Sequence, residues 1–367
     1  MSVMKGQSML YSSFFTNENG IYACGNDTYG QLGLGSIPGQ TWVVHKTEIP
    51  IQAKVIQVVS RQHTLFLCKS GDVWSAGKNF QGQLGYFDEI RTAVPTKIPG
   101  LPPITAIACG DRFSLFLDHQ QSVWICGQNN SHIRKYNHAQ MFTKPAKLEY
   151  LPPITAITCG ENFSLFLDNQ GSVWHCGENI YLPSRKYKQA YKLPLGNLTI
   201  REIACGFYFS LFLDAEGSVW GWGSNYFGHT GELGKLTPLT KVEHIPVIAH
   251  IFCGMNHSMF LDENSSVWAC GDNTFGQLGL GHDEPVMQAH RVTGIPAICT
   301  IACGATHSFF TDFSLNVWGC GSNYERQLGT SQSGNSWKRI LTSFWECENF
   351  SVPKFRPFVV FVENNPG

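Results

Sequence analysis

Charged residues are scarce in this sequence: Asp, Glu, Lys and Arg make up 14% of its 367 residues, against about 25% in an average soluble domain. This shortage argues against a disordered chain, a coiled coil or long solvent-exposed helices. The net charge of −1 argues against a general attraction of the chain to nucleic acids or membranes. No apolar run approaches the roughly eighteen residues that a membrane-spanning helix needs.

Motifs that would indicate targeting or catalysis are also absent. The first twenty residues hold one basic residue, Lys5, and no apolar segment, so no secretion signal is expected. The 13 cysteines are odd in number and include no C-x-x-C pair, which favours a reduced intracellular protein, cytoplasmic or nuclear. No G-x-S-x-G, G-x-x-x-x-G-K-[ST] or H-E-x-x-H motif occurs. We therefore expect no catalytic residue, no cofactor and no metal.

The sequence does contain an internal repeat. The recurring strings resemble Ser-Leu-Phe-Leu-Asp followed by Val-Trp, and each copy can be anchored on the aromatic residue that ends the block. These anchors are Tyr22, Trp74, Trp124, Trp174, Trp220, Trp268 and Trp318. The steps between them are 52, 50, 50, 46, 48 and 50 residues, so we expect residues 1–367 to form one domain.

Each copy has the pattern of several short strands. In the copy anchored at Trp174, apolar residues occupy 154–159 and 164–167, and a turn ending at Gly171 precedes a further strand over 172–176. Leu165 and Leu167 would face one way and Phe166 the other, so the middle strand is apolar on both faces. Such a strand lies between two layers, and each small sheet must therefore be covered by its neighbours.

This pattern predicts an all-β fold, a seven-bladed β-propeller. The chain begins near a second strand, and residues 357–362 resemble the first strands of other copies, such as 103–108. We therefore expect the C-terminal strand to complete the first blade and close the ring. A solenoid and an eighth unit cut short are the alternatives.

One copy shows the full motif most clearly: it reads Cys253-Gly254, His257-Ser258, Val267-Trp268 and Gly276-Gln277-Leu278-Gly279. This motif resembles the repeat of the regulator of chromosome condensation family, and the resemblance covers about residues 8 to 362. It implies a seven-bladed propeller that recognises proteins. It also implies, as a candidate activity, guanine-nucleotide exchange on the small GTPase Ran.

Residues at fixed repeat positions are expected to be structural. The recurring cysteines lie seventeen residues apart within a copy, which suits buried core positions better than a zinc site. The recurring tryptophans are expected to pack between blades, and the recurring aspartates to form turns. The histidine of the motif occurs as His63, His257 and His307, and the sequence alignment places Tyr11, Phe113, Phe163 and Phe209 at this position in the other copies. Its exchange for phenylalanine indicates a structural position.

Departures from the repeat are better candidates for function. A variable pair follows each recurring Cys-Gly, and equivalent loops share one face of a propeller, so these pairs should ring one end of the central channel. The candidate partner-binding residues are Arg61, Gln62, Asp111, Arg112, Glu161, Asn162, Phe207, Tyr208, Met255 and Asn256. Phe207 and Tyr208 are two large aromatics in a loop, and aromatic residues and arginines are enriched at interface hot spots. Local packing is the alternative role.

A second departure is a basic sector. Residues 131–201 carry nine Lys or Arg and four Asp or Glu. The candidate residues are Arg134, Lys135, Lys144, Lys147, Arg185, Lys186, Lys188 and Lys192. They would suit an acidic protein, a lipid headgroup or nucleic acid, and a solvated edge is the alternative.

Function therefore has several candidates. We expect a monomer that binds a protein partner, either as a nucleotide-exchange regulator of a Ran-type small GTPase or as a non-catalytic scaffold. Binding of lipid headgroups or nucleic acid through the basic sector is a further alternative, which strong salt dependence would favour.

Overall fold

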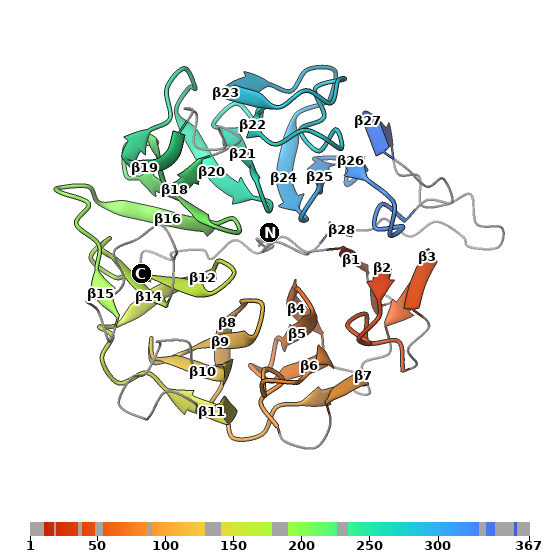
Figure 1. Cartoon of the computed structure of the whole chain (residues 1–367), viewed down its shortest axis with the longest axis vertical. Coiled ribbons are helices and arrows are strands. Elements are labelled where there is room, and N and C mark those ends of the chain that lie inside the picture. The colour runs from red at the N-terminus through yellow and green to blue at the C-terminus, as the bar shows by residue number, and fades with distance from the viewer. Residues whose placement is uncertain are drawn as a thin grey trace.

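The structure is a computed structural model that describes residues 11–17, 20–35, 39–47, 54–86, 90–128, 141–177, 190–225, 234–329, 335–341 and 356–357. Its regular elements are all strands, and among these residues no helix long and apolar enough to cross a membrane occurs. The strands pair into four-stranded antiparallel sheets that are arranged radially around a common centre (Figure 1). The expected all-β propeller is confirmed, and we call the sheets blades, numbered along the chain.

The first three blades follow one another along the chain. Blade 1 contains β1 (Ser12–Asn17), β2 (Gly20–Asp27) and β3 (Gly39–Thr47), with β28 (Arg356–Pro357) paired to β1. Blade 2 contains β4 (Val55–Ser60), β5 (His63–Cys68), β6 (Val73–Lys78) and β7 (Arg91–Lys97). Blade 3 contains β8 (Ile104–Cys109), β9 (Phe113–Asp118), β10 (Val123–Gln128) and β11 (Met141–Lys147).

The other sheets repeat this order. Blade 4 contains β12 (Ile154–Cys159), β13 (Phe163–Asp168), β14 (Val173–Gly177) and β15 (Tyr191–Lys192). Blade 5 contains β16 (Ile200–Cys205), β17 (Phe209–Asp214), β18 (Val219–Asn225) and β19 (Gly234–Lys241). Blade 6 contains β20 (Ile248–Cys253), β21 (His257–Asp262), β22 (Val267–Gly271) and β23 (Val286–Arg291). Blade 7 contains β24 (Ile298–Cys303), β25 (His307–Asp312), β26 (Val317–Ser322) and β27 (Asn335–Leu341).

The second strand is the most buried one in blades 2 to 7, as its sequence predicts. All six residues of β13 are buried, with Leu165 and Leu167 on one face and Phe166 on the other. The same holds for β5, β9, β17, β21 and β25. Because both faces of these strands are covered, stability depends on contacts between neighbouring blades.

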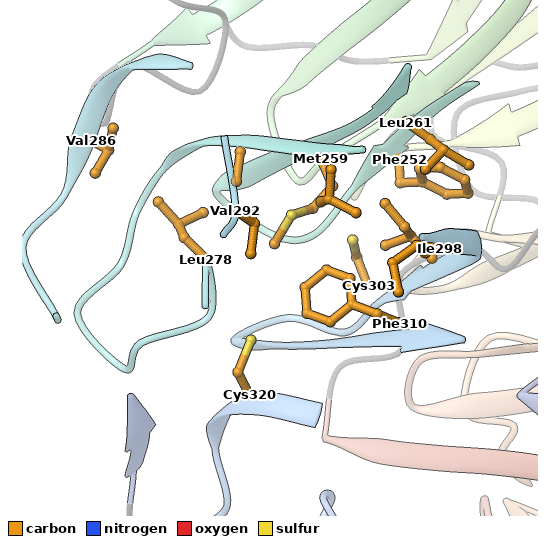
Figure 2. Packing of buried hydrophobic residues seen from close by; sticks show 13 residues of the cluster. Phe252, Met259, Leu261, Leu278, Val286, Val292, Ile298, Cys303, Phe310 and Cys320 are labelled. Carbon is orange, nitrogen blue, oxygen red and sulfur yellow. The ribbon is translucent and has the colours of Figure 1, made fainter. Parts of the chain in front are cut away.

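The hydrophobic core is divided into clusters that lie between adjacent blades. Figure 2 shows the one between blades 6 and 7, where Met259 and Leu261 of β21 face Ile298 and Phe310 of blade 7. Phe310 is fully buried, which stabilises the fold by roughly 1.5–3 kcal/mol. Blades 7 and 1 share a smaller cluster, in which the rings of Phe15 and Phe309 meet edge to face with centroids 5.4 Å apart.

A hydrogen-bonded turn links the second and third strands. In blade 4, Asp168 Oδ1 accepts from the amides of Gln170 and Ser172, at 2.9 and 2.8 Å, and its Oδ2 accepts from Trp174 Nε1 at 2.9 Å. Gly171 takes a φ of 75° in this turn, as a tight hairpin requires. The predicted turn role of the aspartates is confirmed. The tryptophans of blades 3 to 7 combine this bond with packing against the inter-blade clusters, and Trp174 is half-buried.

The motif histidines connect one blade to the next. His63 Nε2 lies 2.8 Å from Ser114 Oγ, which in turn donates to the Gln83 carbonyl at 2.7 Å. Burial lowers the pKa of His63 to about 3, so the ring is neutral and its Nε2–H donates to the serine. The placement of Tyr11 at this repeat position was wrong: Ser12 pairs with Gly25 as His63 pairs with Gly77. Tyr11 therefore belongs to the preceding loop.

Candidate partner-binding surface

The loops between the first and second strands are joined to one another in blades 3 to 7. The Asp111 amide donates to the Glu161 carbonyl at 3.1 Å, and the Glu161 amide donates to the Phe207 carbonyl at 3.1 Å. The Phe207 amide donates to the Met255 carbonyl at 3.0 Å, and the Met255 amide donates to the Ala305 carbonyl at 3.2 Å. We call the loops that hold residues 110–112, 160–162, 206–208, 254–256 and 304–306, with 61–62 of blade 2, the loop ring. Its backbone bonds hold the loops of blades 3 to 7 next to one another on one face.

Blade 2 departs from this pattern, and the predicted alignment of Arg61 was wrong. Ser60 pairs with Thr64 as Cys109 pairs with Ser114, so only two residues separate the strands of blade 2 where three separate those of blade 3. The Arg61 amide donates to the His63 carbonyl, as the Gly110 amide donates to the Phe113 carbonyl. Arg61 thus occupies the glycine position of the repeat. Gln62 is the counterpart of Arg112, and Asp111 has no counterpart in blade 2.

Two aromatic side chains mark the loop of blade 5. The rings of Phe207 and Tyr208 lie 4.6 Å apart at an interplanar angle of 77°, and both residues are half-buried. The Arg61 guanidinium lies 5.8 Å from the centroid of the Phe207 ring. The loop therefore presents an aromatic pair with a cation near one of its rings, a combination typical of interface hot spots.

Polar side chains share the loop ring with this aromatic pair. Arg112 is exposed, and its Nη1 donates to Gln128 Oε1 at 3.4 Å. Gln62 Nε2 donates to Asp111 Oδ2 at 3.5 Å, and Gln62 Oε1 accepts from Lys78 Nζ. The remaining candidates are half-buried: Glu161, Asn162, Met255 and Asn256. The structure thus gathers the predicted residues on one face, and their part in binding stays a prediction.

The same face carries aromatic residues that the sequence analysis missed. Lys78 Nζ lies 4.9 Å from the centroid of the Tyr29 ring and 5.5 Å from that of Phe80. Phe80 is 50% exposed and Tyr324 58% exposed. Both follow the third strand of a blade, at the end where the first strand also finishes, because the strands are antiparallel. They precede the Gly-Gln-Leu-Gly turn or its altered copy, so nothing in the sequence distinguishes them from ordinary residues of that turn.

The basic sector is only partly described. Lys144, Lys147 and Lys192 are exposed, whereas the other five predicted members, Arg134, Lys135, Arg185, Lys186 and Lys188, lie outside the described residues. Lys147 pairs with Trp124 and Lys192 with Trp174. Other blades carry a cation at the same position: Lys46 opposite Tyr22, Lys97 opposite Trp74, Lys241 opposite Trp220 and Arg291 opposite Trp268. These two lysines are therefore part of the repeat rather than a departure from it.

The described cysteines are buried core residues apart from Cys299, which is half-buried. Cys126 Sγ donates to the Gln83 carbonyl at 3.3 Å, and Cys320 Sγ to the Gln277 carbonyl at 3.4 Å. Burial raises the pKa of Cys109 to about 12, so its thiol stays protonated. In the described part of the chain, no three His, Cys, Asp or Glu side chains are grouped as metal ligands would be.

Two models of the same repeat match this chain. Both are described as the regulator of chromosome condensation (RCC1) repeat, one at residues 70–117 and 264–311 and the other at 104–133, 154–181, 200–228 and 248–277. Together these ranges cover about half of the chain. The chain belongs to the regulator of chromosome condensation family.

Curated relatives of this family member include regulators and exchange-factor-like proteins. The Protein RCC2 homolog of Xenopus laevis is 33% identical over 117 residues, which are 31% of this chain and 23% of the relative. The human RCC1-like G exchanging factor-like protein is 33% identical over 95 residues, which are 24% of this chain and 20% of the relative. The matches thus span less than a quarter of these relatives.

Solved structures resemble the chain over nearly its full length. Prp20p from Saccharomyces cerevisiae superposes with a TM-score of 0.79 at 21% identity, covering 92% of this chain and 87% of that one. Human WBSCR16 superposes with a TM-score of 0.74 at 21% identity, covering 84% and 86%. At this identity the likeness shows the fold alone.

Proposed function

We propose that this family member is a protein-interaction propeller that regulates a small GTPase of the Ran type through its loop ring. The observation that supports this most is the aromatic pair Phe207 and Tyr208, held on the same hydrogen-bonded backbone ring as the exposed Arg112. A relative is named as a G exchanging factor-like protein, and the structure of Prp20p was described together with its binding to Gsp1p and histones.

The regulation needs no covalent chemistry. A protein that binds the nucleotide-free GTPase more tightly than the nucleotide-bound form speeds nucleotide release, and the difference between the two affinities sets the acceleration. A preformed backbone ring suits this task, because little conformational freedom is lost when the partner binds.

Release of a fluorescent guanine nucleotide from a panel of small GTPases, including Ran, tests this proposal. We expect the chain to accelerate release on the order of a hundredfold for one GTPase, and Tyr208→Ala or Arg112→Ala to weaken this at least about tenfold. The matched control is Tyr150→Ala, since Tyr150 is 45% exposed and follows β11 at the opposite end of the blade. Binding without acceleration would indicate the non-catalytic scaffold, and no binding to any member would refute the GTPase proposal.

We infer further that the seven sheets form one closed ring and one domain over residues 1–367. Blade 7 contacts blade 1 through the Phe15 and Phe309 rings and through Ser13 Oγ and His307 Nε2, which lie 3.1 Å apart. The pairing of Phe15 with Pro357 and of Thr16 with Arg356 supports completion of blade 1 by the C-terminal segment. Most of the predicted C-terminal strand, residues 358–362, lies outside the described residues.

A double-mutant cycle between Phe15→Ala and Phe309→Ala tests the closure. Rings in edge-to-face contact should show a coupling free energy of about 0.5–1.5 kcal/mol in urea unfolding. A coupling near zero would mean that blades 1 and 7 are apart in solution, and the inferred ring would then be open.

A further inference from the structure

Arg61 extends its side chain into the centre of the propeller. The residue is 2% exposed. It starts on blade 2, yet its Nη2 donates to the Cys159 carbonyl of blade 4 at 3.4 Å, and its guanidinium lies 5.8 Å from the Phe207 ring centroid of blade 5. The charged group therefore reaches across the space around which the blades are arranged.

The shortened loop of blade 2 makes room for this side chain. At the equivalent position of blades 3 and 4, a Cβ on Gly110 would overlap the ring of Phe113, and one on Gly160 would overlap that of Phe163. With one residue fewer in the loop, blade 2 accommodates an arginine where the repeat keeps a glycine. The packing of the repeat gives no reason for a charge here.

The positive charge of Arg61 is unpaired among the described residues. Its Nη1 is buried and has no hydrogen-bond partner among them, and none of their carboxylates lies within 4.0 Å of the guanidinium. His63 and the Cys109, Cys159 and Cys205 thiols, which lie near this charge, do not balance it: burial lowers the pKa of His63 and raises the pKa of the three thiols, so all four are neutral. A buried charge without a counter-charge is strongly unfavourable, so an anion at this place would stabilise the folded chain.

We propose that the centre of the propeller is a carboxylate-binding site, with Arg61 as its cationic ligand and the Phe207 ring as one wall. The guanidinium fork is planar and matches a planar carboxylate. One negative charge balances the single positive charge, whereas a doubly charged phosphate would leave a buried excess. The carboxylate belongs either to a small free acid or to an acidic side chain inserted by a bound protein.

Thermal unfolding of the full chain in sodium formate, with sodium chloride at the same ionic strength as reference, tests the site. Formate should raise the unfolding midpoint of the wild type in a saturable manner, as binding to the native state requires. In Arg61→Met, which keeps packing volume against Phe207 but loses the charge, the midpoint should not respond. Arg61→Lys keeps the charge without the fork and should need at least tenfold more formate. Parallel responses of all three proteins would overturn the proposal.

Two further measurements distinguish the source of the counter-charge. Without added formate, Arg61→Met should unfold at the same temperature as the wild type or higher, because it removes an unpaired charge. A midpoint several degrees lower would mean that the chain already balances the charge, and would also overturn the proposal. Glu161 lies two residues beyond Cys159, so a formate response seen only in Glu161→Gln would identify Glu161 as that internal counter-charge and refute an external ligand.

A peptide arm separates the two kinds of external ligand. A capped Gly-Glu-Gly peptide is compared with capped Gly-Gln-Gly, with formate as the reference. Stabilisation by the glutamate peptide at lower concentration than formate supports an inserted protein side chain, and stabilisation by formate alone supports a small free acid. Neither result depends on a GTPase partner, so this site can fail while the proposed function holds, and the reverse.

Discussion

Exchanging the residues at one repeat position between blades 2 and 4 should lower the free energy of unfolding when the change is made in blade 4 and raise it when the change is made in blade 2. Blade 4 has Asp168, whose carboxylate accepts three hydrogen bonds, including one from Trp174 Nε1. Blade 2 has Cys68 at this position, and the buried Trp74 Nε1 has no hydrogen-bond partner among the described residues. Asp168→Cys therefore removes a hydrogen-bonded turn, and Cys68→Asp supplies the missing acceptor.

The magnitudes follow from the partners that each change loses or gains. Hydrogen bonds to a charged group contribute about 1.5–3 kcal/mol each, but two of the three donors at Asp168 are turn amides that water can reach after the substitution. We expect Asp168→Cys to cost about 3 kcal/mol. Cys68→Asp should stabilise by about 1–2 kcal/mol, because it supplies the acceptor that Trp74 Nε1 lacks. The neighbouring charge of Asp72 does not cancel this gain, since Lys97 Nζ lies 2.8 Å from the Asp72 carboxylate.

Urea unfolding followed by tryptophan fluorescence and circular dichroism measures both changes. Asp283→Cys is the matched control, since Asp283 is exposed and the same substitution there should alter the unfolding free energy by less than about 0.5 kcal/mol. If Cys68→Asp destabilised the chain while Asp168→Cys matched the control, the aspartate–tryptophan bond would contribute nothing and the reasoning would be refuted.

Three further substitutions test other contacts. Asp27 is buried at the position that Asn273 occupies in blade 6, and burial raises the pKa of Asp27 to about 7. The free energy of unfolding of the wild type should therefore fall as the pH rises from about 4 to 7, and Asp27→Asn should remove this pH dependence and gain up to about 4 kcal/mol at pH 8. Denaturation at each pH measures this, and the same pH dependence in both proteins would contradict the prediction. Trp174→Ala should cost about 3 kcal/mol in urea unfolding, and an unchanged midpoint would exclude a packing role. Leu315 occupies the turn position that Gly171 has in blade 4, with a φ of 67° against 75°. A left-handed backbone is strained for leucine, so Leu315→Gly should stabilise the chain by about 1 kcal/mol in the same assay. A lower stability of the variant would show that the side-chain contacts of Leu315 outweigh the strain.

The repeat made the fold predictable because its signals are local and numerous. Strands that are apolar on both faces, such as 164–167, require covering layers whatever the rest of the chain does. The turn of Asp168 was likewise recognisable from its spacing, although the bond to Trp174 was not. That bond joins residues six positions apart, and only the hairpin register brings them together.

The details of the loop ring were harder to predict. Arg61 was placed one position out because the flanking strands of blade 2 keep their apolar pattern, and a single missing residue leaves that pattern intact. The pairing of Ser60 with Thr64 reveals the deletion. Lys147 was counted as a departure for a similar reason, since its equivalence to Lys97 follows from the strand opposite and not from its neighbours in sequence.

Two kinds of contact connect neighbouring blades at the position of the motif histidine. Where a blade has the motif histidine and a Gly-Gln-Leu-Gly turn, the turn carbonyl of Gln83 accepts from Ser114 and Cys126 of the next blade. That turn is then part of the contact between blades and cannot change freely. Blades 3 to 5 have phenylalanine in place of the histidine, as in Phe163, which needs no hydrogen-bond partner and is fully buried. At this repeat position, blades 3 to 5 therefore contact the next blade through apolar packing instead of a hydrogen bond.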